Sequence, residues 1–250
     1  MTAVELIATR ATSTWATGLF LSLFWLQAPA QTVPPMDGIV GKLPPGAWRV
    51  TGLPAVKKPF TRFDAVPMDA KTVLRVQTDK SYSNLTYTFA PAVAAGILRW
   101  RWRLDQPVAG ADLRRKEGDD TPIKVCALFD LPLENISFWE RNVLRMARNA
   151  TGQHLPGAAV CYVWDQKLAV GTELTNAFTK RVHYVVLNSA NNPLQQWVNH
   201  KRDLRTDFML SFHTESATVP PLLGITVGAD ADNTAGSSLA YLDDLTHMEQ

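Results

Sequence analysis

The sequence predicts an all-β protein, an antiparallel β-sandwich of jelly-roll type with one inserted amphipathic helix. After residue 47, short stretches in which apolar and polar residues alternate recur along most of the chain, and this period of two is typical of half-buried strands. Turn-forming residues separate these stretches, and only one substantial segment has a helical period. Many short strands of this kind are typical of sandwiches and barrels, so a half-open barrel is the alternative.

The N-terminus has the pattern of a removable secretory signal. Arg10 supplies a positive charge, residues 16–26 are almost wholly apolar, and Ala28-Pro29-Ala30 matches a signal-peptidase site. This apolar run is shorter than the roughly 20 residues of a membrane-spanning helix. We expect cleavage after residue 30, with an uncleaved anchor as the alternative, and no later segment is apolar enough to span a membrane.

The remainder of the chain divides into a leader and one domain. Residues 31–47 are rich in Pro and Gly and predict a loose leader, whereas residues 48–250 show no linker and predict a single sandwich domain. Further strands are expected at residues 48–50, 72–78, 85–89, 123–129, 159–164, 181–187, 195–200, 223–227 and 238–246.

The clearest alternation lies in residues 98–104. Its apolar members, Leu98, Trp100, Trp102 and Leu104, point to one side of the expected strand. The arginines between them point to the other side. One face of this strand is therefore expected to be buried against a second layer, and the other to form a basic stripe.

One segment predicts a substantial helix. Residues 136–148 place apolar side chains on one side of a helix. A second, weaker helical segment is expected at residues 203–212, where large apolar residues recur every fourth position. The apolar side of the first helix consists of Ile136, Trp139, Val143, Met146 and Ala147.

Charge and motifs exclude several classes of function. The net charge is +2, so charge alone implies no polyanionic partner, and no basic, aromatic-interleaved patch of the nucleic-acid type is present beyond the short Arg-Trp strand. The sequence contains no GxSxG, HExxH, P-loop or dinucleotide-binding motif. Nucleic acid is therefore not an expected partner.

The two cysteines, Cys126 and Cys161, each lie in an apolar, strand-like run. Export would permit a disulfide between them, provided that the two runs are neighbouring strands in the right register. Two buried free thiols are the alternative. Without CxxC spacing, a metal site at these residues is not expected.

Arg99, Arg101 and Arg103 form the basic stripe, which has two interpretations. The stripe is either a solvated outer face or a concave face on which guanidinium groups grip carboxylates or phosphates. In the second interpretation Lys124, in a following strand, extends this face. The ligand site would then suit an acidic glycan.

Two acidic loops are further candidates. Asp119 and Asp120 form the first, which we group with the basic stripe as a candidate ligand site. Asp230, Asp232 and Asn233 belong to the second, where alternating carboxylates suit a hard cation such as Ca²⁺. The rest of an EF-hand is missing, and Asp and Asn also favour turns for backbone reasons alone. Structural turns, a calcium ion and a ligand-binding or catalytic role therefore all stay open.

Five short runs, taken in order, resemble a bacterial exported family, the domain of unknown function 3047. The resemblance covers residues from about 45 to the C-terminus, and it implies a Gram-negative, periplasmic or exported setting without any known activity. Lys124 stands where the family typically has Arg, and Cys126 where it typically has an aromatic residue. The runs are Leu98-Arg99-Trp100-Arg101-Trp102, Gly118-Asp119-Asp120, Tyr162-Val163-Trp164, Gln196-Trp197-Val198 and Asp230-Ala231-Asp232-Asn233-Thr234.

Three hypotheses for function follow. The first is a periplasmic ligand-binding or accessory module, with a carbohydrate as the candidate ligand. The second is a glycan hydrolase or lyase on the same scaffold, which needs two carboxylates or a Tyr or His base. Because His183 and Tyr184 are adjacent in one strand, at most one of them joins a site. The third is a structural envelope protein whose inserted helix docks a partner.

Overall fold

The structure, a computed structural model, describes residues 33–38, 46–52, 58–152 and 154–249. The predicted signal, residues 1–30, and much of the predicted leader lie outside the described residues. Of the leader, Val33 is buried against the core, and the carbonyl of Pro34 accepts a hydrogen bond from Trp48 Nε1 at 3.2 Å. No helix in the described part of the chain has the length and apolar character needed to cross a membrane.

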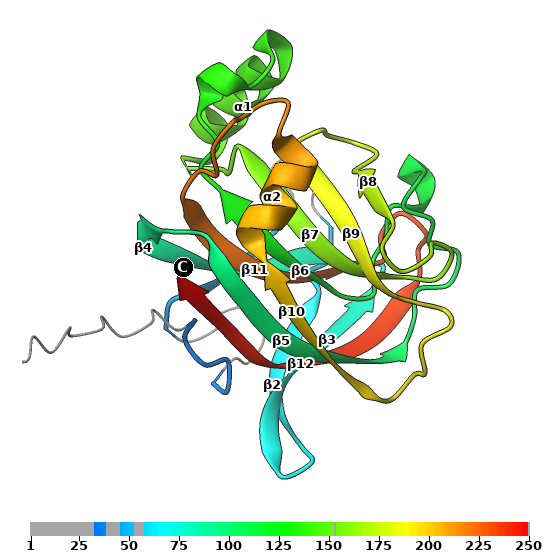
Figure 1. The fold of residues 1–250 in the computed structure, drawn as a ribbon. Coiled ribbons are helices and arrows are strands. Elements are labelled where there is room, and N and C mark those ends of the chain that lie inside the picture. Colours follow the sequence, from blue (N-terminus) through cyan, green and yellow to red (C-terminus); the bar gives the residue numbers. More distant parts are fainter. Residues whose placement is uncertain (1–32, 39–45, 53–57, 153, 250) are drawn as a thin grey trace, which may run out of the picture.

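Twelve strands of the described chain form two sheets that pack face to face (Figure 1). The seven-stranded sheet has the order β1-β4-β11-β6-β7-β9-β8, and the five-stranded sheet has the order β10-β5-β12-β3-β2. The predicted all-β sandwich with an inserted helix is thereby confirmed. The strands are β1 (Trp48–Thr51), β2 (Arg62–Met68), β3 (Lys71–Asp79), β4 (Tyr82–Val93), β5 (Gly96–Gln106), β6 (Lys124–Phe129), β7 (Ala158–Asp165), β8 (Glu173–Thr175), β9 (Val182–Ser189), β10 (Trp197–Asp203), β11 (Leu222–Asp230) and β12 (Ser237–Glu249).

The core lies between the two sheets and is rich in aromatic side chains. Leu98, Trp100, Trp102 and Leu104 of β5 are all buried, as their alternation predicts. The Trp100 ring packs 5.1 Å from that of Tyr162, which belongs to β7 of the opposite sheet. Inward-facing residues of the two sheets therefore interdigitate, and the outer faces carry the remaining side chains.

The alternation of apolar and polar residues did not predict two of the strands, nor that one pair of strands runs in parallel. β2 and β8 were not predicted, because β2 contains Pro67 and the half-exposed β8 has only three residues. Both are edge strands, where apolar alternation is weakest. β7 and β9 pair in parallel, with Ala159 opposite Val182, because β8 takes the place outside β9 instead of lying between the two strands.

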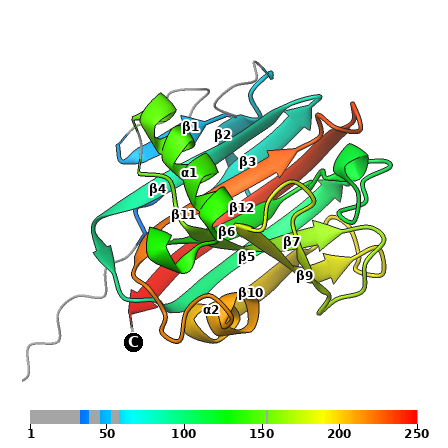
Figure 2. The same ribbon diagram turned by 90° about the horizontal axis from the view of Figure 1, so that it is seen from above.

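The two helices differ in how they pack. α2 (Leu204–Phe212) lies beside β10 (Figures 1 and 2), and it buries Leu204, Phe208 and Phe212. α1 (Phe138–Thr151) buries only Leu144 among its described side chains. Trp139 and Met146, which belong to its predicted apolar side, are 76% and 71% exposed. Periodicity thus located this helix correctly but did not reveal that its apolar side faces away from the core.

A half-buried histidine makes stability depend on pH. Its ring packs against Trp102 at 4.7 Å, and its Nε2 lies 3.0 Å from Asn188 Oδ1. Burial, aided by the charge of Arg202, lowers the pKa of His200 to about 4, from 6.5 in the unfolded chain. The unfolded state therefore binds an extra proton between these values, and stability falls as the pH falls through this window.

We expect His200 to account for a loss of about 2 kcal/mol in the free energy of unfolding between pH 7 and pH 5. Urea denaturation at both values measures this loss, which should shrink in the His200→Gln variant. The matched control, His213→Gln, changes an exposed histidine and should keep the wild-type loss. An equal loss in all three proteins would contradict the assignment to His200.

Candidate functional site

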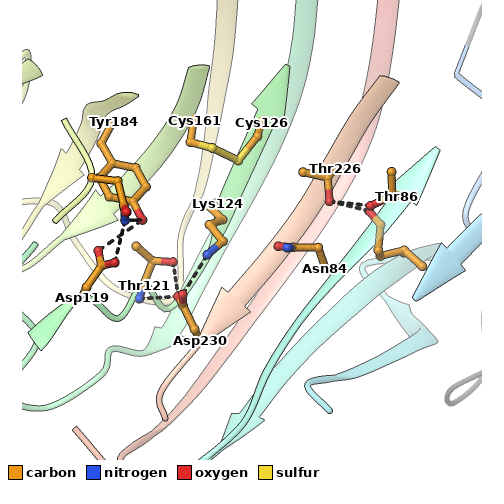
Figure 3. The surroundings of a disulfide bond; sticks show 12 residues. Asn84, Thr86, Asp119, Thr121, Lys124, Cys126, Cys161, Tyr184, Thr226 and Asp230 are labelled. Atoms are coloured by element: carbon orange, nitrogen blue, oxygen red, sulfur yellow. Dashed lines mark hydrogen bonds and ion pairs between the residues drawn. A yellow bond between two sulfur atoms is a disulfide. The ribbon is translucent and has the colours of Figure 1, made fainter. Parts of the chain in front are cut away.

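The outer face of the seven-stranded sheet carries a row of neutral polar side chains. Thr86 of β4 lies opposite Thr226 of β11, and the hydroxyl of Thr51 of β1 lies 3.5 Å from that of Thr86. The Thr86 hydroxyl donates to that of Thr226 at 3.1 Å, and the two appear together in Figure 3. Asn84 and Thr88 of β4 continue the row, since residues two apart on a strand share a face. This face offers hydroxyl and amide groups rather than charges.

A groove of about 1500 Å³ lies over this polar row. Besides the sheet residues, it is lined by α1, by residues 154–156 and by the segment 175–181, which begins at the last residue of β8. Trp139 of α1 is 76% exposed, and Phe178 of the 175–181 segment is 57% exposed. Among the described residues that line the groove, Glu140 is the only carboxylate, and it pairs with Arg181 at 3.3 Å.

A buried ion pair lies on the same sheet face, beside the groove (Figure 3). The Lys124 ammonium donates to Asp230 Oδ2 at 2.8 Å, and both side chains are buried. The other Asp230 oxygen accepts from the backbone N–H and the hydroxyl of Thr121, at 2.7 and 2.6 Å. Burial alone would lower the pKa of Lys124, but the Asp230 carboxylate outweighs this effect and raises it. Lys124 is therefore charged at every physiological pH.

Glycine at position 228 makes room for this pair. A β-carbon added to Gly228 would lie 2.0 Å from Asn84 Oδ1 and 2.9 Å from Lys124 Cε. Contacts this close force neighbouring atoms to move, so a larger residue would displace the lysine. The packing of β11 against β4 and β6 thus requires glycine here.

A second buried cluster joins the first acidic loop to the groove. Asn176, which lines the groove, donates through Nδ2 to Asp119 Oδ2 at 2.6 Å and to the Tyr184 hydroxyl at 2.9 Å. The Tyr184 hydroxyl donates to Asp119 Oδ1 at 3.2 Å. Burial and the nearby Asp230 charge raise the pKa of Asp119 to about 6. The Asn176 Oδ1 in turn accepts from the N–H groups of Phe178 and Thr179.

This cluster therefore fixes the segment that carries Phe178. We expect Asn176→Ala to lower the free energy of unfolding by about 1–2 kcal/mol, because it leaves buried partners unpaired. Hydrogen–deuterium exchange should also become faster in residues 176–181. The matched control is Asn192→Ala, because Asn192 Oδ1 accepts from Ser189 N–H at 2.8 Å in a similar turn. Unchanged exchange in residues 176–181 of Asn176→Ala would refute the positioning role.

The two acidic loops meet, a question that the sequence left open. Asp120 accepts from the N–H groups of Asn233 and Thr234, at 3.1 and 2.7 Å, and from the Thr234 hydroxyl. Asn233 Nδ2 donates to the carbonyl of Asp119 at 3.0 Å. Asp232 pairs with Lys58 at 3.4 Å. The carboxylates thus bind protein donors and hold the two loops together.

The calcium alternative at Asp230, Asp232 and Asn233 stays a prediction, although protein groups already occupy much of the binding capacity of Asp230 and Asn233. Both Asp230 oxygens accept hydrogen bonds from protein groups, one from Thr121 and the other from the Lys124 ammonium. Asn233 uses its amide as a donor rather than as a ligand oxygen. Within the described ranges, no three His, Cys, Asp or Glu side chains are placed to hold a metal ion.

The grouping of the arginine stripe with Lys124 is wrong. Arg99, Arg101 and Arg103 lie on the outer face of the five-stranded sheet, whereas Lys124 lies on the outer face of the other sheet. Alternation assigns side chains to a face of a strand but does not say which sheet the strand joins. Asp119 and Asp120 likewise lie with Lys124 and not with the stripe.

The stripe is also largely neutralised by the protein itself. Arg101 pairs with Asp243 and stacks on the Trp197 ring at 4.5 Å. Arg103 pairs with Asp105 at 2.7 Å. Of the three arginines, Arg99 alone is exposed. This face therefore fits a solvated outer surface better than a ligand-binding site.

Cys126 and Cys161 form a disulfide on the groove side of the seven-stranded sheet (Figure 3). They are directly opposite one another on β6 and β7, with 4.0 Å between their Cα atoms. Cys126 lies two residues after Lys124 and shares its face. The disulfide thus ties β7 to β6, the strand that carries Lys124.

The fold and the groove define a β-sandwich domain with an open, partly aromatic groove on one sheet. A family model matches residues 46–246, and the chain belongs to that family, described as protein of unknown function (DUF3047). No curated protein matches the chain. The solved structures that it resembles include endoglucanase 3 of Trichoderma harzianum, from family GH12, at 10% identity and a TM-score of 0.44 over 88% of this chain and 99% of that one. We draw no functional conclusion from this likeness.

Sequence reasoning missed most of the groove. Asn84, Thr86 and Thr226 are ordinary polar members of strands, and nothing in their spacing distinguishes them. Asn176 and Phe178 lie in a loop without any recognised motif. The adjacency of His183 and Tyr184 predicted that at most one of them joins a site. Tyr184 joins the Asp119 cluster, whereas the His183 ring packs on Phe212.

Proposed function

We propose that this protein is an exported carbohydrate-binding module whose groove holds a segment of a polysaccharide. The observation that carries the proposal is the pairing of exposed aromatic side chains, Trp139 and Phe178, with a row of hydroxyl and amide groups in one groove. Sugar rings have apolar faces that stack on aromatic rings and hydroxyl groups that need polar partners. A largely apolar site with a few placed polar groups is the usual form of such pockets.

The charges that line the groove favour an acidic glycan. Arg49 and Lys180 are exposed, while the charge of Arg181 is balanced by Glu140 and Glu215. The groove therefore has an excess of positive charge. Carboxylate or phosphate groups on the glycan would pair with these two cations, so binding should weaken as salt is added.

Binding is favoured over hydrolysis because the described residues that line the groove include no pair of carboxylates. Glycosidases flank the scissile bond with two Asp or Glu residues. Among the described lining residues Glu140 stands alone, and its carboxylate is held by Arg181. Asp119 and Asp230 lie beside the groove, but both are buried and hydrogen-bonded to protein groups.

A polysaccharide array tests the proposal. The domain is incubated with matched neutral and acidic polysaccharides, and the same samples are assayed for chain cleavage. We expect retention on acidic glycans without formation of products. Failure to retain any glycan would overturn the binding role, and release of shortened or unsaturated products would establish an enzyme instead.

Export is the second part of the proposal, and it rests on the sequence of residues 1–30. Expression with the native N-terminus followed by cell fractionation tests it. We expect protein in the periplasmic fraction with a mass that corresponds to a start at Gln31. Full-length protein in the cytoplasmic fraction would contradict export.

A further inference from the structure

The part of α1 turned away from the groove exposes large apolar side chains. Phe138 and Met146 are 70% and 71% exposed, and neither lines the groove. Trp139, at the rim of the groove, is 76% exposed. Figure 1 shows α1 at the upper edge of the molecule, clear of the strands. A contiguous patch of exposed apolar side chains, unlike a single one, marks an interaction site.

Basic residues accompany these apolar groups. Arg145 is exposed, and the Arg141 guanidinium lies 5.7 Å from the centre of the Phe138 ring. Glu140 is the only acidic residue of α1, and it lines the groove, where it pairs with Arg181. The outer surface of α1, formed by Phe138, Arg141, Arg145 and Met146, is therefore apolar and positively charged.

We propose that the outer surface of α1 binds an anionic lipid bilayer. A helix that combines aromatic and other apolar side chains with arginines has the composition of one that lies in the membrane interface. Arginine can extend its charged head to the phosphates while its stem stays among apolar groups. The positive charge and the apolar side chains thus complement the two chemical layers of such a surface, and the exposed position of α1 gives it access.

The proposal does not depend on the glycan groove. The polar row and Phe178 belong to the groove, whereas Phe138, Arg145 and Met146 do not line it. Loss of membrane binding in a variant of the outer surface should therefore leave glycan binding intact. The two proposals can fail separately.

Hydrogen–deuterium exchange of the full chain, with and without vesicles, tests the proposal. Site-resolved exchange is needed because the apolar residues 16–26 would themselves partition into lipid. We expect protection of residues 138–151 by vesicles that contain 30% phosphatidylglycerol, and little protection by pure phosphatidylcholine. Arg145→Glu should weaken binding roughly tenfold or more, because each basic group near an anionic surface contributes severalfold. Phe138→Ser/Met146→Ser should abolish the protection.

Two variants provide matched controls. Arg99→Glu changes an exposed arginine on the five-stranded sheet, and Leu210→Ser changes an apolar residue of α2 that is 54% exposed. Both should bind vesicles like the wild type. Unprotected α1, or equal protection by both kinds of vesicle, would overturn the proposal. So would protection of α1 by a second copy of the chain, seen as dimerisation without lipid.

Discussion

Replacement of Lys124 by methionine is expected to lower the free energy of unfolding by about 3–5 kcal/mol. The change removes the ammonium that pairs with Asp230 at 2.8 Å and leaves a buried carboxylate with only the Thr121 donors. The nearby charge of Asp119 adds repulsion. Urea denaturation at pH 7 measures the loss.

Two further variants show whether the loss comes from the broken pair. Lys124→Met/Asp230→Leu removes both charges, and it should recover part of the lost stability because no unpaired charge stays buried. Lys71→Met breaks the half-exposed pair with Asp244 and should cost no more than about 1 kcal/mol. A loss below about 1 kcal/mol in Lys124→Met would contradict the buried pair.

Loss of the disulfide is expected to have the second largest effect. Cys126 and Cys161 are 35 residues apart in the sequence, and a loop of this length corresponds to about 3–4 kcal/mol of stabilisation in the chain-entropy model. The double variant Cys126→Ala/Cys161→Ala should lose this amount. Thermal unfolding with and without dithiothreitol should show the same change in the wild type.

The double variant also serves as the control for the reductant, because dithiothreitol should not alter its midpoint of unfolding. Thiol titration establishes that the wild-type bond is reduced. A fully reduced wild type that unfolds at the same temperature as the oxidised protein would show that the disulfide contributes nothing to stability.

The sequence predicted the fold better than the site, for physical reasons. The period of two in β5 reports burial of one face directly, and Leu98, Trp100 and Trp102 are buried as expected. The same signal carries no information on strand order, so Lys124 was assigned to the wrong sheet. The edge strands β2 and β8 were not predicted because their partial burial weakens the alternation of apolar and polar residues.

The residues of the groove could not be predicted from the sequence for a different reason. Thr86 and Thr226 meet only because β4 and β11 pair, although they are 140 residues apart. Phe178 is placed by the hydrogen bonds of Asn176 to its loop. The carboxylates of the acidic loops bind distant protein groups, Asp120 with Thr234 and Asp230 with Lys124. Long-range pairing of this kind leaves no trace in local patterns.

The most direct test of the glycan-binding groove is calorimetric titration of an array-selected polysaccharide into the wild type and three variants. Trp139→Ala and Phe178→Ala should each weaken binding about tenfold or more, because exposed aromatic anchors carry much of the binding energy in such sites. Trp197→Ala, which removes a tryptophan from the five-stranded sheet, should bind like the wild type. Equal affinity in all four proteins would contradict the assignment of this groove as the binding site.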